Sequence, residues 1–213
     1  MPETTTSPRR GRRAAASRED VLDAVMHRYL RGRRIDVQEI AAELGLGRTT
    51  IYRWFGSRDK LIGEVVAKAG EPALQAARAR AKGRGGQALL ETFDNFNRFL
   101  ADNRVLRTFV ERERDAALRI ITSGAGTVQP RMVAMITGLI TDEIEAGTYV
   151  APVEPDTLGY AIVRLAESFL FNDAAAGIRG DVDRLRDVEA AILGIGAPDS
   201  GKGASRRRAR APR

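Results

Sequence analysis

The sequence predicts an all-α fold, and two observations carry that prediction. The periodic segments are rich in Ala, Leu, Arg and Glu, and their apolar residues recur every three to four positions. Strand-like alternation is scarce, and Gly or Pro stands at the ends of the periodic segments. The expected helices span residues 18–32, 37–44, 48–54, 58–81, 87–102, 104–121, 130–146, 156–172 and 181–194.

Residues 36–61 carry the clearest local signals in the chain. Over residues 37–44 the apolar positions follow helical spacing, so one face of this helix is expected to be buried. Asp36 stands at the N-cap position and Glu39 follows three residues later, which is the pattern of a capping box. Gly45 comes directly after the last apolar residue, where a helix end favours the positive φ that glycine adopts without steric cost.

A second short helix is expected to begin near Arg48. Ile51 and Phe55 lie four residues apart and predict its buried face, which leaves the basic and hydroxyl-bearing side chains outward. Two short helices joined by a glycine turn form a helix-turn-helix, whose second helix enters the major groove of DNA. Because the first turn of such a helix faces base edges, Arg48 and Thr49 are predicted to read bases.

The remaining outward residues are assigned by their distance from that first turn. Tyr52 and Arg53 lie one turn further on and are expected to reach a base or a phosphate. The residues predicted to position phosphates are Thr50, Trp54, Arg58 and Lys60. The alternative for Tyr52 and Trp54 is that they are packed core aromatics.

Capping and loop residues place the later helices. Ser57 is expected to cap the helix over 58–81, with Asp59 in its first turn, where a negative charge suits the helix dipole. Pro130 is expected to begin a helix. Loops are predicted where Gly and Pro gather, at residues 82–86, 123–129 and 148–155.

The composition narrows the class of protein. Of 213 residues 43% are hydrophobic, which is enough for a core. The absence of cysteine excludes disulfides and thiolate chemistry, and the single His27 disfavours a histidine metal site or a Ser-His triad. Glu111, Glu113 and Asp115 lie in a run of alternating charge, which is typical of a solvated helix face. We therefore predict no enzyme, no cofactor and no metal site.

The net charge of +7 is concentrated at the two ends of the chain. Residues 1–17 carry four Arg and one Glu, and residues 197–213 carry six Lys or Arg and one Asp. Their composition predicts disordered basic arms, which either attract phosphates without sequence preference or are simply solvated. The chain has neither an 18-residue apolar run nor a signal-peptide core, so a cytoplasmic protein with no membrane contact is expected.

The run LGLGRTTIYRWFGSRDKL (residues 44–61) resembles the signature of TetR-family transcriptional regulators. VLDAVMHRYL (residues 21–30) resembles the first helix of that family, and the whole match covers about residues 18–66. Gly47 stands where the family has Ser or Thr at the N-cap of the recognition helix. Arg58 stands where the family has Lys; it keeps the charge and adds a planar group able to hold phosphate at two points.

The resemblance implies an all-α protein with an N-terminal three-helix helix-turn-helix domain and a C-terminal helical ligand-binding and dimerisation domain. The expected divisions are a disordered basic arm over 1–17, a DNA-binding domain over 18–66, a ligand-binding and dimerisation domain over 67–196 and a disordered basic tail over 197–213. The resemblance also implies that Gln38 contacts DNA. The expected partners are a palindromic double-stranded DNA operator, a second copy of the chain and a small-molecule effector.

The resemblance also implies an effector pocket among the C-terminal helices. The candidate lining residues are Phe93, Phe96, Phe109, Met132, Met135, Tyr160 and Arg164. The alternative is that the Phe and Met residues are plain core. Arg164 and Glu167 interrupt an apolar helix three residues apart, so they are expected to pair with each other, across a dimer seam or with a polar ligand group. Helices 156–172 and 181–194 are apolar enough to form a four-helix dimer seam.

Within the family, YRWFGSRDKLIGEV (residues 52–65) and ESFLFND (residues 167–173) are similar to actinobacterial regulators grouped with the repressor of quorum-signal lactone degradation. That likeness implies a lactone-like or other apolar acyl effector. The sequence thus predicts a dimeric repressor that a small apolar effector releases from its operator. The alternative is a DNA-binding dimer without an effector, acting as an architectural protein or an activator.

Overall fold

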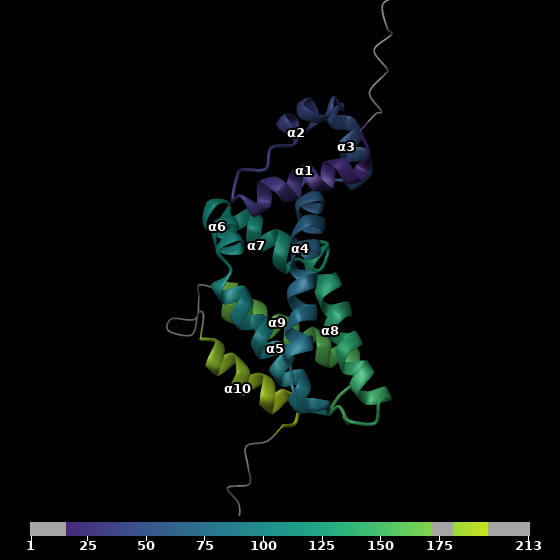
Figure 1. Cartoon of the computed structure of the whole chain (residues 1–213), viewed down its shortest axis with the longest axis vertical. Helices are drawn as coiled ribbons and strands as arrows, with labels where there is room; N and C mark the ends of the chain where they lie inside the picture. The colour runs from purple at the N-terminus through teal and green to yellow at the C-terminus, as the bar shows by residue number, and fades with distance from the viewer. Residues whose placement is uncertain (1–15, 172–180, 196–213) are drawn as a thin grey trace, which may run out of the picture.

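The computed structural model describes residues 16–171 and 181–195, which form helices and no strand (Figure 1). The helices are α1 (Arg18–Leu30), α2 (Val37–Leu44), α3 (Arg48–Phe55), α4 (Arg58–Arg80), α5 (Gly85–Asp102), α6 (Arg104–Arg112), α7 (Arg114–Thr122), α8 (Val128–Glu145), α9 (Pro155–Phe171) and α10 (Val182–Ile192). The all-α prediction is confirmed. The predicted basic arm, apart from its last two residues, and the predicted basic tail lie outside the described residues. Within the described ranges, no helix is both long and apolar enough to cross a membrane.

Residues 104–121, predicted as one helix, form two. α6 ends at Arg112, and Glu113, at φ −135° and ψ 51°, separates it from α7. At this break the Glu113 carboxylate accepts hydrogen bonds from the Arg58 guanidinium at 2.9 and 2.6 Å. The apolar spacing is helical on both sides, so local periodicity could not indicate a break that accompanies an ion pair to a distant residue.

The other predicted helices agree with the structure to within two residues at each described end. α8 begins at Val128, so the loop predicted over 123–129 is shorter than expected. Pro130 consequently lies in the first turn of α8, where amide groups have no intrahelical partner and proline sacrifices no hydrogen bond.

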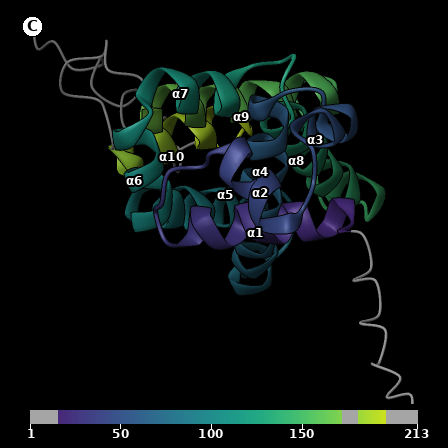
Figure 2. The ribbon, with the colours of Figure 1, turned by 90° about the horizontal axis from the view of Figure 1, so that it is seen from above.

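The buried apolar residues form two clusters that share α4. The first cluster joins α1, α2, α3 and the first half of α4 to α6 and α7. The second joins the last part of α4 to α5, α8, α9 and α10. α4 therefore runs from one cluster into the other, with α1 to α3 at one end of the molecule (Figure 1). Seen from that end, α1 to α3 lie in front of the remaining helices (Figure 2).

Candidate functional site

The turn between α2 and α3 has the geometry that the sequence predicts. Gly45 adopts φ 66°, and the Leu46 amide donates to a carbonyl of the last turn of α2 at 2.8 Å. At the start of α2, the Asp36 carboxylate accepts from the amides of Gln38 and Glu39. These backbone hydrogen bonds lower the pKa of Asp36. The two helix ends are thus fixed by local chemistry, which sets the direction in which α3 leaves the turn.

α3 presents a basic and hydroxyl-bearing face to solvent. Ile51 and Phe55 are buried in the first cluster, as their spacing predicts. Arg48, Thr49 and Arg53 are exposed on the outer side of the helix. This is the arrangement that a helix needs to place side chains against base edges.

Tyr52 and Trp54 are half-buried. Their exposure is intermediate between that of a side chain that contacts DNA and that of a packed core aromatic. Both rings pack against the first apolar cluster. The Arg48 guanidinium lies over the Tyr52 ring, with its central carbon 5.7 Å from the ring centroid. Tyr52 therefore orients the exposed Arg48 while it also contacts the core. Gln38 and Lys60 are exposed, and Thr50 is half-buried.

α3 begins without a side-chain cap. Gly47 is its N-cap, at φ −77° and ψ 142°, and contributes only its carbonyl, which accepts from the Thr50 amide at 2.9 Å. At α4, by contrast, the Ser57 hydroxyl accepts from the Lys60 amide at 3.1 Å, as predicted. Amides at an uncapped helix N-terminus are natural ligands for an anion such as a phosphate.

Arg58, which the sequence predicts to position a phosphate, is engaged by groups of the protein itself. The guanidinium donates to the Ile35 carbonyl at 3.2 and 3.1 Å, as well as to Glu113. Its side chain is 28% exposed. Its Nε and Nη2 atoms donate within the protein, at the place where the start of α4 meets the break between α6 and α7.

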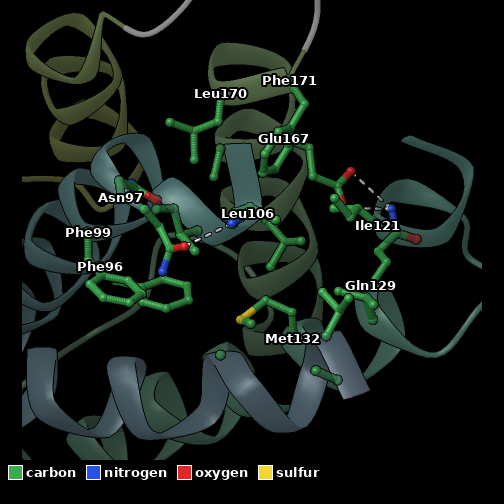
Figure 3. Close-up of a pocket in the computed structure, with 18 of the residues that line it drawn as sticks. Phe96, Asn97, Phe99, Leu106, Ile121, Gln129, Met132, Glu167, Leu170 and Phe171 are labelled. Carbon is green, nitrogen blue, oxygen red and sulfur yellow. Dashed lines mark hydrogen bonds between the residues drawn. The ribbon is translucent and has the colours of Figure 1, made fainter. Parts of the chain in front are cut away.

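A cavity of about 260 Å³ lies where the two apolar clusters meet (Figure 3). Its wall is mainly apolar and includes residues from α1 and from every helix from α4 to α10. α1 contributes Tyr29 and Leu30, and α4 contributes Val66, Ala67 and Gly70 among others. A cavity of about 150 Å³ can hold benzene, so this one has room for a molecule of about ten heavy atoms.

The structure divides the predicted lining residues into two groups. Those that line the cavity are Phe93, Phe96 and Met132. Phe96 and Met132 are labelled in Figure 3. Those that lie outside its wall are Phe109, Met135, Tyr160 and Arg164. The separation follows from tertiary packing, because Phe and Met occur in both groups at the same helical spacing.

Each residue outside the wall has another location. Phe109 is buried edge-on against Tyr29, with ring centroids 5.7 Å apart. Met135 packs against the second cluster. Tyr160 is 52% exposed on the outer face of α9. Arg164 is exposed and pairs with Glu167 at 2.7 Å, so the predicted pairing within the helix is confirmed.

Glu167 supplies one polar group of the wall. Each of its carboxylate oxygens accepts from the Gln129 amide at 3.2 Å, and one also accepts from Arg164. Gln129 donates in addition to the Thr122 carbonyl at 3.0 Å. Burial raises the pKa of Glu167, although the bonds from Gln129 and Arg164 oppose that shift. This end of the cavity holds an acid whose two oxygens are both hydrogen-bonded.

Asn97 and Glu189 supply a second polar group, which sequence reasoning did not find. The Asn97 amide donates to one Glu189 oxygen at 2.9 Å across α5 and α10, and both side chains are buried. Burial raises the pKa of Glu189 to about 8, and the charge of Asp94 adds to the shift. The only available signal was the placement of a Glu on the apolar side of helix 181–194.

The exposed basic helix α3 packs against α4, and α4 also lines the mainly apolar cavity. This arrangement defines a DNA-binding regulator with a C-terminal helical part. Residues 84–194 match the family model described as the tetracyclin repressor-like C-terminal domain. The chain belongs to the TetR family. Members of this family are generally non-enzymatic DNA-binding transcriptional repressors, and dimerisation and ligand binding are typical of them.

Two solved structures are similar over most of the chain. The R. erythropolis transcriptional repressor QsdR, from the TetR family, has 27% identity and a TM-score of 0.77, covering 83% of this chain and 94% of QsdR. The TetR-family repressor AlkX from Dietzia sp. strain DQ12-45-1b, implicated in biodegradation of n-alkanes, has 25% identity and a TM-score of 0.57, covering 87% and 98%. The likeness to QsdR agrees with the branch of the TetR family that residues 52–65 and 167–173 resemble. A comparison with curated proteins finds no match.

Proposed function

We propose that the chain is a ligand-responsive, dimeric transcriptional repressor. Residues 18–66 form the DNA-binding domain, and residues 67–196 bind the effector and the second subunit. Two copies of α3 read a palindromic operator, and a small apolar effector in the cavity releases the protein from DNA. The observation that carries this proposal is that α1 and α4, which pack against α3, also form part of the cavity wall.

An effector in this cavity would act directly on the DNA-binding helices. Tyr29 and Leu30 at the end of α1, and Val66 to Gly70 in α4, would contact it. Well-packed helices shift as units when an adjoining space is filled, and small shifts at an effector site are amplified at a distance. A movement of α4 would change the position of α3, which is joined to it by the short turn at Gly56 and Ser57.

Ion pairs provide a second connection between the two parts. Arg58 holds Glu113 at the break between α6 and α7, and Asp59 accepts from Arg119 of α7 at 2.9 Å. Both pairs join the first turn of α4 to helices whose residues Leu106 and Ile121 line the cavity. They tie the start of α4, next to the recognition helix, to the cavity wall.

The second subunit is needed because a palindrome presents two half-sites, about one DNA turn or roughly 34–36 Å apart. We place the dimer seam on α9 and α10. Tyr160 and Val188, which are large and exposed on these helices, support that choice. The apolar wall, the relation to QsdR and the n-alkane context of AlkX support an apolar effector, such as a lactone or another acyl compound.

The assignment of base-reading and phosphate-positioning roles on α3 and α4 gives the first test. Arg48→Ala should abolish the preference for the operator over random DNA, because an arginine bidentate to guanine is worth about 1–3 kcal/mol of discrimination. Lys60→Ala should weaken binding to both DNAs alike, because a phosphate contact carries no sequence information. Binding titrations on operator and random duplexes at fixed salt measure both effects. An equal loss of operator preference in the two variants would contradict the assignment.

The release of DNA by an effector gives the second test. A panel of lactones and other apolar acyl compounds is added to the operator complex, and dissociation is followed together with the melting temperature of the free protein. At least one compound should both release the DNA and shift the melting temperature. Ala166 lines the cavity, so Ala166→Phe should fill part of the cavity and abolish both effects while operator binding remains. If no compound releases DNA or shifts melting, the alternative of a DNA-binding dimer without an effector is correct.

A further inference from the structure

We propose that Glu189 and Asn97 form a hydrogen-bond-donating end of the cavity, which selects neutral apolar effectors carrying a carbonyl or ether oxygen over hydrocarbons and over carboxylates. This inference rests on the proposed effector function and specifies the effector class. The supporting observations are the location of Glu189 in the wall, its burial and its one unsatisfied oxygen.

Glu189 is fully buried, and its two carboxyl oxygens differ in their partners. Oε1 accepts from the Asn97 amide at 2.9 Å. Oε2 is buried and has no hydrogen-bond partner among the residues that the structure describes. A buried polar atom without a partner is destabilising, so a ligand that satisfied it would bind more tightly. Glu189 is one of the residues that line the cavity, so this oxygen belongs to the cavity wall.

The protonation state of Glu189 decides what kind of ligand group fits. Burial keeps the acid protonated at neutral pH, and the neighbouring Asp94 acts in the same direction. A protonated carboxyl donates one O–H, so its natural partner is an acceptor oxygen. Among the residues that the structure describes, Arg98 and Arg186 both pair with Asp94, at 3.0 and 3.6 Å, so neither of these two cations is free to hold a ligand carboxylate.

The opposite polar end of the cavity does not offer the same chemistry. Figure 3 shows Asn97 on one side of the cavity and Glu167 with Gln129 on the other, with Met132 between them in the view. The Glu167 oxygens already accept from Gln129 and Arg164. The donors at that end, Gln129 and Arg164, already bond the Glu167 carboxylate and the Thr122 carbonyl. A ligand oxygen there would have to compete for these donors, whereas at Glu189 it would form a new hydrogen bond. The polar group of the effector is therefore assigned to the Glu189 end.

Three probes of matched size separate the possible ligand classes: 2-nonanone, n-decane and octanoate. Calorimetric titration of the full-length protein at neutral pH should give tightest binding for 2-nonanone, with n-decane about tenfold weaker and octanoate weaker still. Glu189→Leu should bind 2-nonanone and n-decane alike, because it keeps the apolar volume and loses the donor. Glu189→Gln should keep the preference for the ketone, because its amide still donates.

Two controls distinguish recognition from folding. Asp187→Ala changes an exposed acidic residue of the same helix and should leave all three affinities unchanged. If Glu189→Leu does not fold, the infrared difference spectrum between wild type and Glu189→Gln isolates the carboxylic acid C=O band, which should shift when 2-nonanone binds. A band that does not move on ketone binding would overturn the proposal without the leucine variant.

The outcomes separate this inference from the proposed function. Equal binding of the three probes, or a preference for octanoate, would overturn the role of Glu189 and leave the cavity as an effector site. An unchanged ketone preference in Glu189→Leu would do the same. Failure of all three probes to bind would overturn this inference and also count against an effector of the proposed size.

Discussion

Gly85→Ala is expected to destabilise the protein by about 3 kcal/mol. Gly85 adopts φ 65°, a left-handed conformation that costs an L-residue about 1 kcal/mol or more. An added Cβ would also overlap the carbonyl oxygen of Thr148. Overpacking of this kind costs about 1–3 kcal/mol when the neighbour cannot move. The two costs add because they have separate causes.

The Thr148 backbone is held in place by Glu143, so it cannot relax away from the new methyl group. The amides of Thr148 and Tyr149 donate to the Glu143 carbonyl at 3.0 and 3.2 Å. The Thr148 hydroxyl and the Gly85 amide donate to the Glu143 carboxylate, each at 2.6 Å. Arg78 completes the cluster as an ion-pair partner. Burial by itself raises the pKa of Glu143, but these contacts outweigh it and the pKa is lowered.

Gly83→Ala is the matched control for this prediction. Gly83 has φ 79°, and nothing lies within 4 Å of the position of an added Cβ. Its replacement should cost only the conformational part, about 1 kcal/mol. Thermal or urea unfolding at one fixed protein concentration measures both variants. Equal losses in the two variants would mean that the contact with Thr148 is not the cause.

The DNA-binding half was predictable because its signals are local. The positive φ of Gly45, the cap at Ser57 and the burial of Ile51 and Phe55 each depend on residues within one or two turns. Helix capping and amphipathic spacing act over that range, so a sequence pattern records them directly. Arg58 is the exception, since its partners Ile35 and Glu113 lie 23 and 55 residues away.

The cavity was not predictable in the same way. Phe93 and Phe109 have the same side chain and the same amphipathic setting, yet only Phe93 lines the cavity. The difference arises because helices from both apolar clusters contact one another around the cavity. The periodicity within one helix does not predict which other helices it packs against. Glu189 was missed for the same reason, because its partner Asn97 is 92 residues away. A buried acid can be identified only when the helices that cover it are known.

Wild-type stability is expected to fall as pH rises from about 5 to about 7.5, and Glu189→Gln should remove that part of the fall. The pKa of Glu189 is about 8 in the folded protein, against its ordinary value of 4.5. Between these two values the unfolded chain loses the proton while the folded protein keeps it. Unfolding is therefore favoured by about 1.4 kcal/mol per pH unit. The stabilising effect of the buried neutral acid is complete below pH 4.5 and lost above pH 8.

The difference between variant and wild type isolates Glu189 from the other acids. Asp94, Arg98 and Arg186 face the same region of α5 and α10 and are present in both proteins, as is Glu167 with its own raised pKa. Their contributions cancel in the difference. The stability of Glu189→Gln relative to wild type should thus increase by about 3 kcal/mol over this pH range. Asp187→Asn, on the exposed side of the same helix, should show no such trend. A pH-independent difference for Glu189→Gln would mean that Glu189 is ionised in the folded protein, and the neutral donor required for ketone selection would be absent.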